Sequence, residues 1–153
     1  AYFIAAGRLH AIGAGVLLAE IQQTSDVTYR VYDWDRIDNN GNARELHNDL
    51  AIQAFDFQMP DNYSVDYQKE ENKPHEMVSC SFFTTNFLKV NGTIVKHNTK
   101  DSFIIYMCVE GEVVIETNSD DEQLKKGETL LIPAAIETYK ITSTNATLLE
   151  VYV

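Results

Sequence analysis

The sequence predicts an all-β fold, an antiparallel sandwich or barrel, and two observations carry that prediction. Short runs rich in β-branched and aromatic residues recur along the chain, separated by turn-type stretches such as NG, EG and KKGE. Of the 153 residues, 44% are apolar and 23% are charged, a balance typical of a packed domain. A chain of this length fits one domain, with room for part of a second.

The elements follow in chain order from these patterns. Residues 15–23 (GVLLAEIQQ) and 27–34 (VTYRVYDW) alternate in polarity around the turn QTSD and predict a hairpin. A short helix is expected within 43–57, where apolar residues recur at helical spacing, and a charged connection over 56–75. Further strands are expected at 77–88, 93–98, 102–109, 112–117, 129–132, 137–142 and 147–153.

The charge balance disfavours nucleic acid as a partner. Asp and Glu number 23 against 12 Lys and Arg, a formal charge of -11, and no basic cluster offsets it. No apolar run approaches the roughly 20 residues that a membrane-spanning helix needs, and no segment resembles a signal peptide. We therefore expect a cytoplasmic protein that binds neither nucleic acid nor membranes.

The cysteines and the start of the chain give two further expectations. Cys80 and Cys108 lie in separate apolar runs and predict buried thiols rather than a disulfide or a metal-binding pair. The chain begins at Ala1, directly in an apolar run. We expect either that an initiating Met was removed or that the chain is the later part of a longer protein.

Side-chain alternation in the expected hairpin predicts a polar patch. Glu20 and Gln22 share one face of the first strand, and the turn lays them beside Asp26 and Arg30 of the second. The same pattern fits a solvated sheet face with Arg–carboxylate pairs. His10, upstream of the hairpin, belongs to the residue type that most often binds metals, but a single His also fits a structural role. The residues alone leave these alternatives open.

One long stretch resembles a known family. GRLHAIGAGVLLAEIQQTSDVTYRVYDWDR at 7–36 and ELHNDLAIQAFDF at 45–57 resemble the type I mannose-6-phosphate isomerases of the bacterial short form, zinc-dependent enzymes of the cupin superfamily. The shared motifs are Gly-x-x-His-Ala-Ile-Gly, Glu-Ile-Gln-Gln-x-Ser-Asp-x-Thr-Tyr-Arg and Tyr-Asp-x-Asp-Arg. Ala5 departs from the pattern, which usually has Pro there. The chain resembles the C-terminal half of the family, most strongly over 7–57.

The resemblance implies interconversion of mannose 6-phosphate and fructose 6-phosphate through an enediol. It implies that His10 is the last of four ligands of one zinc and that Glu20 and Gln22 bind the sugar. Arg30 and Asp26 would be catalytic, with Arg30 stabilising the enediolate and Asp26 orienting it or shuttling the proton. In this family the other zinc ligands come from strands upstream of these motifs, so we expect the chain alone to be inactive.

The resemblance also implies an antiparallel cupin or jelly-roll barrel with a short connecting helix, plus partial strands of a preceding barrel. The expected division is the last strands of the catalytic barrel over 1–40, a helix and connection over 41–76, and a metal-free cupin-like barrel over 77–153. In this second barrel Thr138 stands where metal-binding cupins have His. Its interior is expected to contain Phe103, Ile105, Met107 and Val113.

Two other functions stay open. A non-catalytic carbohydrate-binding or regulatory cupin module would hold a sugar with Glu20, Gln22, Asp26 and Arg30 and need no metal. A metal-dependent cupin of different chemistry, such as a dioxygenase, would need two or three His on neighbouring strands, which this sequence does not have. Open strand edges in residues 1–36 also predict a homodimer formed through those edges.

Overall fold

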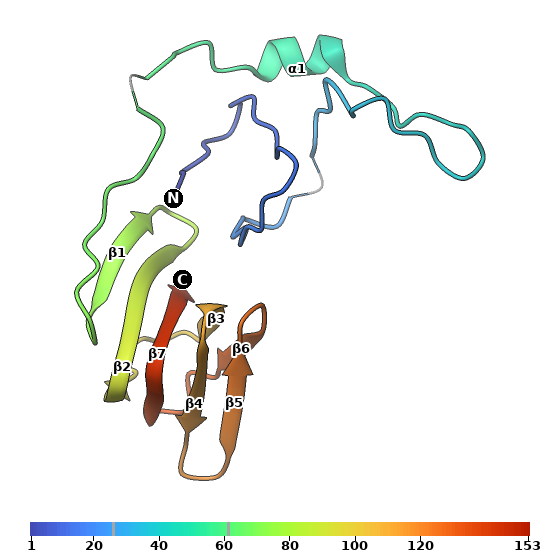
Figure 1. Cartoon of the computed structure of the whole chain (residues 1–153). Coiled ribbons are helices and arrows are strands. Elements are labelled where there is room, and N and C mark those ends of the chain that lie inside the picture. Colours follow the sequence, from blue (N-terminus) through green and yellow to red (C-terminus); the bar gives the residue numbers. More distant parts are fainter. Residues whose placement is uncertain (26, 61) are drawn as a thin grey trace. The chain divides into compact units, whose positions relative to one another are not determined.

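The computed structural model describes residues 1–25, 27–60 and 62–153, and their contacts divide the chain into two units. One unit is Tyr2–Tyr63, and the other is Ser64–Val153 together with Ala1. All the strands of the sheet belong to the second unit (Figure 1). The boundary between the units lies inside 41–76, the range in which the sequence predicts a connection.

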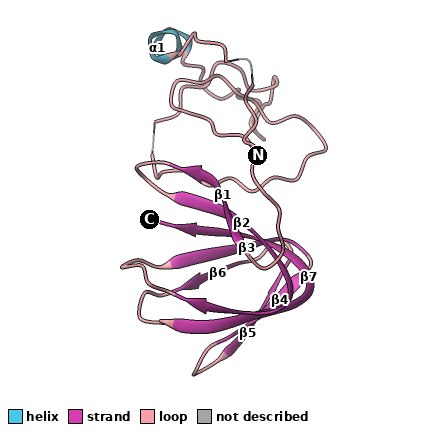
Figure 2. Cartoon of the chain, turned by 90° about the vertical axis from the view of Figure 1, so that its left-hand side faces the viewer, coloured by secondary structure: helices cyan, strands magenta, loops and turns pink. Residues whose placement is uncertain are grey.

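The unit Ser64–Val153 is a curled antiparallel sheet. Its strands are β1 (Pro74–Ser79), β2 (Thr84–His97), β3 (Ile104–Glu110), β4 (Glu112–Glu116), β5 (Asp121–Lys125), β6 (Thr129–Ile132) and β7 (Thr138–Tyr152). They pair in the order β1-β2-β7-β3-β6, and β4 pairs with both β5 and β7. Figure 2 shows the sheet rolling round an interior. The all-β antiparallel prediction is confirmed.

Two long strands organise this barrel. β2 and β7 pair from Thr84 with Tyr152 at one end to His97 with Thr138 at the other. The register shifts beside Gly92, whose φ of 91° is a conformation that a residue without a Cβ adopts at low cost. The opposite edge of β7 is shared between β3 and β4. β7 therefore borders three strands.

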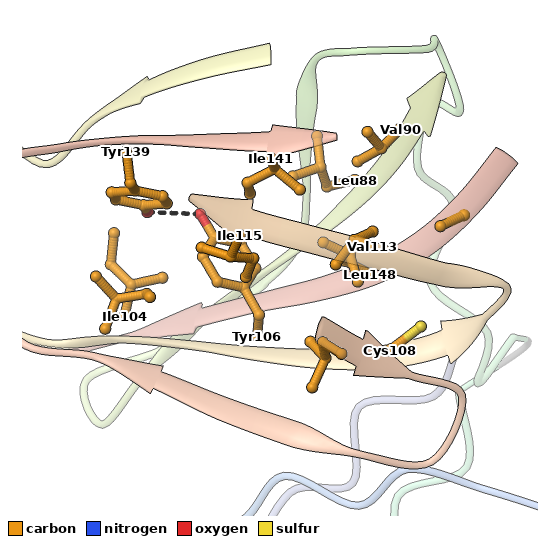
Figure 3. Close-up of a cluster of buried hydrophobic side chains, with 13 residues drawn as sticks. Leu88, Val90, Ile104, Tyr106, Cys108, Val113, Ile115, Tyr139, Ile141 and Leu148 are labelled. Carbon is orange, nitrogen blue, oxygen red and sulfur yellow. Dashed lines mark hydrogen bonds between the residues drawn. The ribbon is translucent and has the colours of Figure 1, made fainter. Parts of the chain in front are cut away.

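The core fills the inside of the barrel, where alternate side chains of the strands meet (Figure 3). Burying a large aliphatic or aromatic side chain of this kind contributes about 1.5–3 kcal/mol to stability. The buried members are Leu88, Val90, Ile104, Tyr106, Cys108, Val113, Ile115, Leu124, Ile132, Tyr139, Ile141, Ala146 and Leu148. This core, rather than local propensity, holds the sheet in its curled form.

The inward face of β3 corrects a sequence prediction. The even positions 104–108 fill the core, whereas Phe103, Ile105 and Met107, which were expected inside, lie on the other face. Val113 is buried as expected. Because both faces of β3 are apolar, alternation alone does not show which face points into the core. The register with β7 determines the inward face.

Several boundaries also differ from prediction. α1 (Asn48–Ala54) is shorter than the expected range 43–57 and buries one residue, Ala51. The expected strand 77–88 is broken by a turn between β1 and β2, while 137–142 and 147–153 are parts of one strand, β7. β5 lies where the sequence predicts a connection between 117 and 129, because four of the five residues of DEQLK are polar. Leu124 is its one buried side chain.

The expected hairpin at 15–34 is wrong as sheet structure. Among the described residues of Tyr2–Tyr63 no regular strand forms, although an isolated bridge pairs Ile37 with Ala43. The side chains of Val16, Leu17 and Leu18 are 61%, 83% and 47% exposed. An isolated two-stranded hairpin is marginally stable in water, and this one has no covered apolar face. In 1–25 and 27–40 the expected partial strands are likewise not formed, and the dimer through strand edges stays a prediction.

Two further sequence expectations concern the cysteines and membrane-spanning helices. Both cysteines are free, with Cys108 buried as predicted and Cys80 half-buried. No helix within the described ranges has the length and apolar character that crossing a membrane requires.

Candidate functional site

The loop that carries His10 is held against the segment after α1. The Asp56 amide donates to the Gly7 carbonyl at 2.9 Å, and the Arg8 guanidinium lies 3.7 Å from the Asp56 carboxylate. Gly7 has a φ of 82°, and a Cβ at this position would collide with the Ala54 carbonyl. The loop thus depends on glycine at this close approach.

His10 is exposed, and its ring is oriented by the backbone. Nδ1 lies 3.0 Å from the Arg8 carbonyl oxygen. Because that oxygen only accepts, Nδ1 carries the hydrogen and Nε2 keeps its lone pair. Metal-binding histidines commonly donate one ring N–H to a carbonyl in this way and bind the metal through the other nitrogen.

Arg30 is fixed through contacts with the segment just before α1. Its amide donates to Nδ1 of His47 at 3.1 Å, and its carbonyl accepts from the His47 amide at 2.7 Å. The Arg30 guanidinium donates to the Glu45 carbonyl at 3.4 Å. The ring of the neighbouring Tyr29 lies 6.3 Å from the His47 ring, centroid to centroid. Arg30 is half-buried, so backbone and side chain are both restrained.

A bidentate ion pair closes the loop that follows. Arg44 donates to the two carboxylate oxygens of Asp33 at 2.7 and 2.5 Å. These hydrogen bonds hold the pKa of Asp33 below its usual range. Asp33 and Ala51 are the buried residues of Tyr2–Tyr63 within the part that the structure describes. The sequence analysis did not single out this pair, although the alternation of VYDW places Asp33 opposite Arg30.

The structure shows no contact of His10, Glu20 or Gln22 with Arg30 among the described residues. Glu20 and Gln22 are exposed, and Asp26 lies outside the described residues. Among the described side chains no hydrogen bond or ion pair joins His10, Glu20, Gln22 and Arg30. Across the same residues no group of three or more His, Cys, Asp or Glu side chains could hold a metal ion.

A polar cluster that sequence analysis missed lies inside the barrel. We define the interior polar cluster as Asn86, Lys96, Tyr106, Tyr139 and Glu150. Lys96 Nζ lies 2.5 Å from Glu150 Oε2, which also accepts from the Tyr106 hydroxyl at 2.7 Å, while Asn86 donates to Oε1 at 3.0 Å. The Tyr106 and Tyr139 hydroxyls are 2.8 Å apart (Figure 3). The signals in the sequence were a Glu within TLLEVYV and a Lys within TIVKH.

The cluster joins two places that are distant along the strands. Asn86 pairs with Glu150 near one end of the β2–β7 ladder, and Lys96 pairs with Tyr139 near the other. Ten residues of straight strand would span about 33 Å. The Lys96–Glu150 contact is made because the ladder rolls back on itself, so the cluster ties the two ends of the ladder together.

Burial and charge set the protonation of this cluster. Burial alone would raise the pKa of Glu150, but the Lys96 ammonium and the hydrogen bonds from Tyr106 and Asn86 lower it below the ordinary value. Burial raises the pKa of Tyr139 to about 12, and it raises that of Tyr106 further. Glu150 is therefore ionised and both phenols are neutral at pH 7. Every member already has a partner, which favours a structural role.

The barrel matches a known protein family. The sequence profile described as "Mannose-6-phosphate isomerase, cupin domain" matches residues 73–153, more than half of the chain. The chain belongs to this family. The family predicted from the motifs is confirmed, and residues 73–153 of the barrel match its cupin domain.

Curated relatives extend the likeness beyond the cupin domain. YvyI of Bacillus subtilis (strain 168) is 35% identical over 146 residues, 94% of this chain and 46% of that protein. Mannose-6-phosphate isomerase ManA of the same organism is 30% identical over 142 residues, 92% of this chain and 45% of ManA. The chain thus spans a little under half the length of these relatives, and the matches include most of residues 7–36.

A solved structure agrees with these matches. The crystal structure of the mannose 6-phosphate isomerase from Bacillus subtilis superposes with a TM-score of 0.72 and 31% identity, covering 84% of this chain and 41% of that one. Because Ser64–Val153 makes up about three-fifths of the chain, this likeness extends into Tyr2–Tyr63. A protein from Neisseria meningitidis, 16% identical with a TM-score of 0.50, shares the fold of 56% of the chain.

Proposed function

We propose that this chain forms part of an enzyme that interconverts mannose 6-phosphate and fructose 6-phosphate. The observation that carries the proposal is the match to ManA over 92% of the chain, which reaches into the segment of His10, Glu20 and Arg30. The restrained position of Arg30 supports it, because catalysis requires charged groups that are oriented before the reaction.

The proposed reaction moves one proton from C2 to C1 of the sugar, and one from the oxygen on C2 to the oxygen on C1. Loss of the C2 proton leaves negative charge over both oxygens of the enediolate. Arg30 stabilises that charge with its guanidinium. Glu20 and Gln22 bind the sugar hydroxyls, and Asp26 orients the reacting end or carries the proton.

His10 fits the role of a zinc ligand, because its Nδ1 is bonded to the Arg8 carbonyl and its exposed ring leaves Nε2 available. His10 would be one of four zinc ligands, and the described residues bring no group of three or more such ligands together. We propose that the other ligands come from the part of the enzyme that this chain does not span. When bound, zinc would polarise the sugar oxygens as a Lewis acid.

The first test joins this chain to the part of ManA that lies outside the matched 142 residues. ManA itself and the chain alone are measured beside the chimaera, for zinc content and for interconversion of the two sugar phosphates. We expect the chimaera to bind about one zinc and to turn over, and the chain alone to be inactive. Arg30→Ala in the chimaera should lower kcat roughly 100-fold to 1000-fold.

The outcome that contradicts the proposal is a folded chimaera that binds sugar phosphate but does not convert it while ManA does. That result would favour the non-catalytic carbohydrate-binding module. Circular dichroism of the chimaera separates this outcome from failure to fold.

A further inference from the structure

Arg30 and His47 exchange two hydrogen bonds across 17 positions of sequence. Antiparallel strands form such a pair with two carbonyl acceptors, one from each residue. Here one of the two acceptors is a side-chain atom, Nδ1 of His47, at 3.1 Å from the Arg30 amide. The other is the Arg30 carbonyl, at 2.7 Å from the His47 amide. The His47 ring therefore takes the place of a backbone group in holding Arg30.

This hydrogen bond fixes the tautomer of the neutral His47 ring. An acceptor nitrogen carries no hydrogen, so the neutral His47 ring carries its hydrogen on Nε2. The Nε2 atom faces the exposed Glu45 carboxylate at 3.9 Å. The backbone carbonyl of the same residue, Glu45, accepts a hydrogen bond from the Arg30 guanidinium. Residues 45–47 thus contact Arg30 at its amide, its carbonyl and its side chain.

The anchor for these contacts is the first turn of α1. The His47 carbonyl accepts from the Ala51 amide at 2.8 Å, and Ala51 is the most buried residue of the helix. The His47 side chain makes no capping hydrogen bond to the helix. Replacing the ring therefore removes support from Arg30 without removing a helix cap.

We infer that His47 is a positioning residue for Arg30: its Nδ1 holds the Arg30 amide so that the guanidinium meets the charge of the enediolate. This inference rests on the proposed function of Arg30. His47 acts through Arg30 and needs no contact with the sugar.

Two variants of His47 test the inference. Asn offers a carbonyl oxygen close to the position of Nδ1, and Ala offers no acceptor. In the active chimaera we expect His47→Ala to lower kcat up to about 100-fold, the scale of a misplaced group, with KM changed less than threefold. His47→Asn should restore most of kcat. The matched control is His97→Ala, which removes an exposed ring on β2 bonded to Thr138, and it should leave kcat unchanged.

A second measurement uses this chain alone and needs no activity. In ¹⁵N-labelled protein, coupling across the hydrogen bond should connect the Arg30 amide nitrogen with Nδ1 of His47. Exchange of the Arg30 amide with solvent should be at least tenfold faster in His47→Ala than in His47→Asn.

Together, the kinetic and the NMR measurements distinguish failure of the inference about His47 from failure of the proposed function. An active chimaera whose kcat is unchanged by His47→Ala overturns the inference and leaves the proposed function standing. Absence of the coupling, with Nδ1 protonated, overturns it whatever the chimaera does. An inactive chimaera that shows the coupling contradicts the proposed function and, with it, the catalytic role that His47 is inferred to support.

Discussion

The two units of the chain are stabilised in different ways. Ser64–Val153 buries a continuous core inside a rolled sheet, whereas Tyr2–Tyr63 is held by backbone bridges and ion pairs such as Asp33–Arg44. In Tyr2–Tyr63 large apolar side chains stay exposed, Leu17 among them. The residues proposed for catalysis lie in the unit with little core. The family model matches the unit with the continuous core, whereas the residues proposed for catalysis have few buried neighbours in their own unit.

The largest expected effect comes from breaking the interior polar cluster. Lys96→Met leaves the buried Glu150 carboxylate without its counter-charge, which should lower the free energy of unfolding by about 3–5 kcal/mol. Urea denaturation followed by tyrosine circular dichroism measures this. Adding Glu150→Gln should recover part of the loss, because no charge is then buried. Lys140→Met, on the exposed face of β7, is the control. An equal loss of stability in this variant would contradict the stabilising role of the interior polar cluster.

A matched pair of leucines sharpens the comparison of the units. Leu148 is fully buried and Leu17 is 83% exposed. Leu148→Ala should cost about 2–5 kcal/mol through lost burial and the cavity left behind. Leu17→Ala should change stability by less than about 0.5 kcal/mol. A large effect at Leu17 in urea denaturation would mean that a surface not seen in this chain covers it.

Acid should weaken the barrel through Glu150. Its pKa in the folded protein is lower than the ordinary value of 4.5, so the folded state binds fewer protons than the unfolded one. The contribution of Glu150 is complete above pH 4.5 and is lost as pH falls through the lowered pKa. Urea midpoints at a series of pH values should show this loss. Glu122→Gln, which changes an exposed carboxylate of β5, should keep the same profile; a flat profile in the parent chain contradicts the role of Glu150.

The smallest effect is expected from Asp33→Asn. This change removes the charge that pairs with Arg44 but leaves the barrel untouched. Trp34, the single tryptophan of the sequence, reports on this loop by its fluorescence. We expect the fluorescence transition to move to lower urea while the transition in far-ultraviolet circular dichroism, to which the strands of Ser64–Val153 contribute, stays in place. Two transitions that move together would show that the units unfold as one.

Sequence patterns predicted the fold best where burial dominates. β3, β4 and β6 were placed within a few residues, because apolar residues there reflect a real core. β5 was missed because a strand that pairs with β4 alone along its length needs few apolar residues. The inward face of β3 was assigned wrongly because both of its faces are apolar.

The candidate site was predicted by resemblance rather than by pattern. Alternation placed Glu20, Gln22 and Arg30 on one face of a hairpin that the described residues do not form. Nothing in the order of residues shows that the His47 ring accepts a hydrogen bond from the Arg30 amide. Contacts of this kind depend on loop geometry, which local sequence does not specify.

The position of β7 in the chain has a consequence for biosynthesis. It comes last of the seven strands, yet it is the neighbour of β2, β3 and β4. During translation those strands emerge from the ribosome with unpaired edges, which can pair with other chains. The barrel closes only after Tyr152 has been added. A polypeptide that stopped a few residues before Tyr152 would therefore expose unpaired edges of these strands and be prone to aggregation. A nascent chain paused before Thr138 would be expected to bind chaperones.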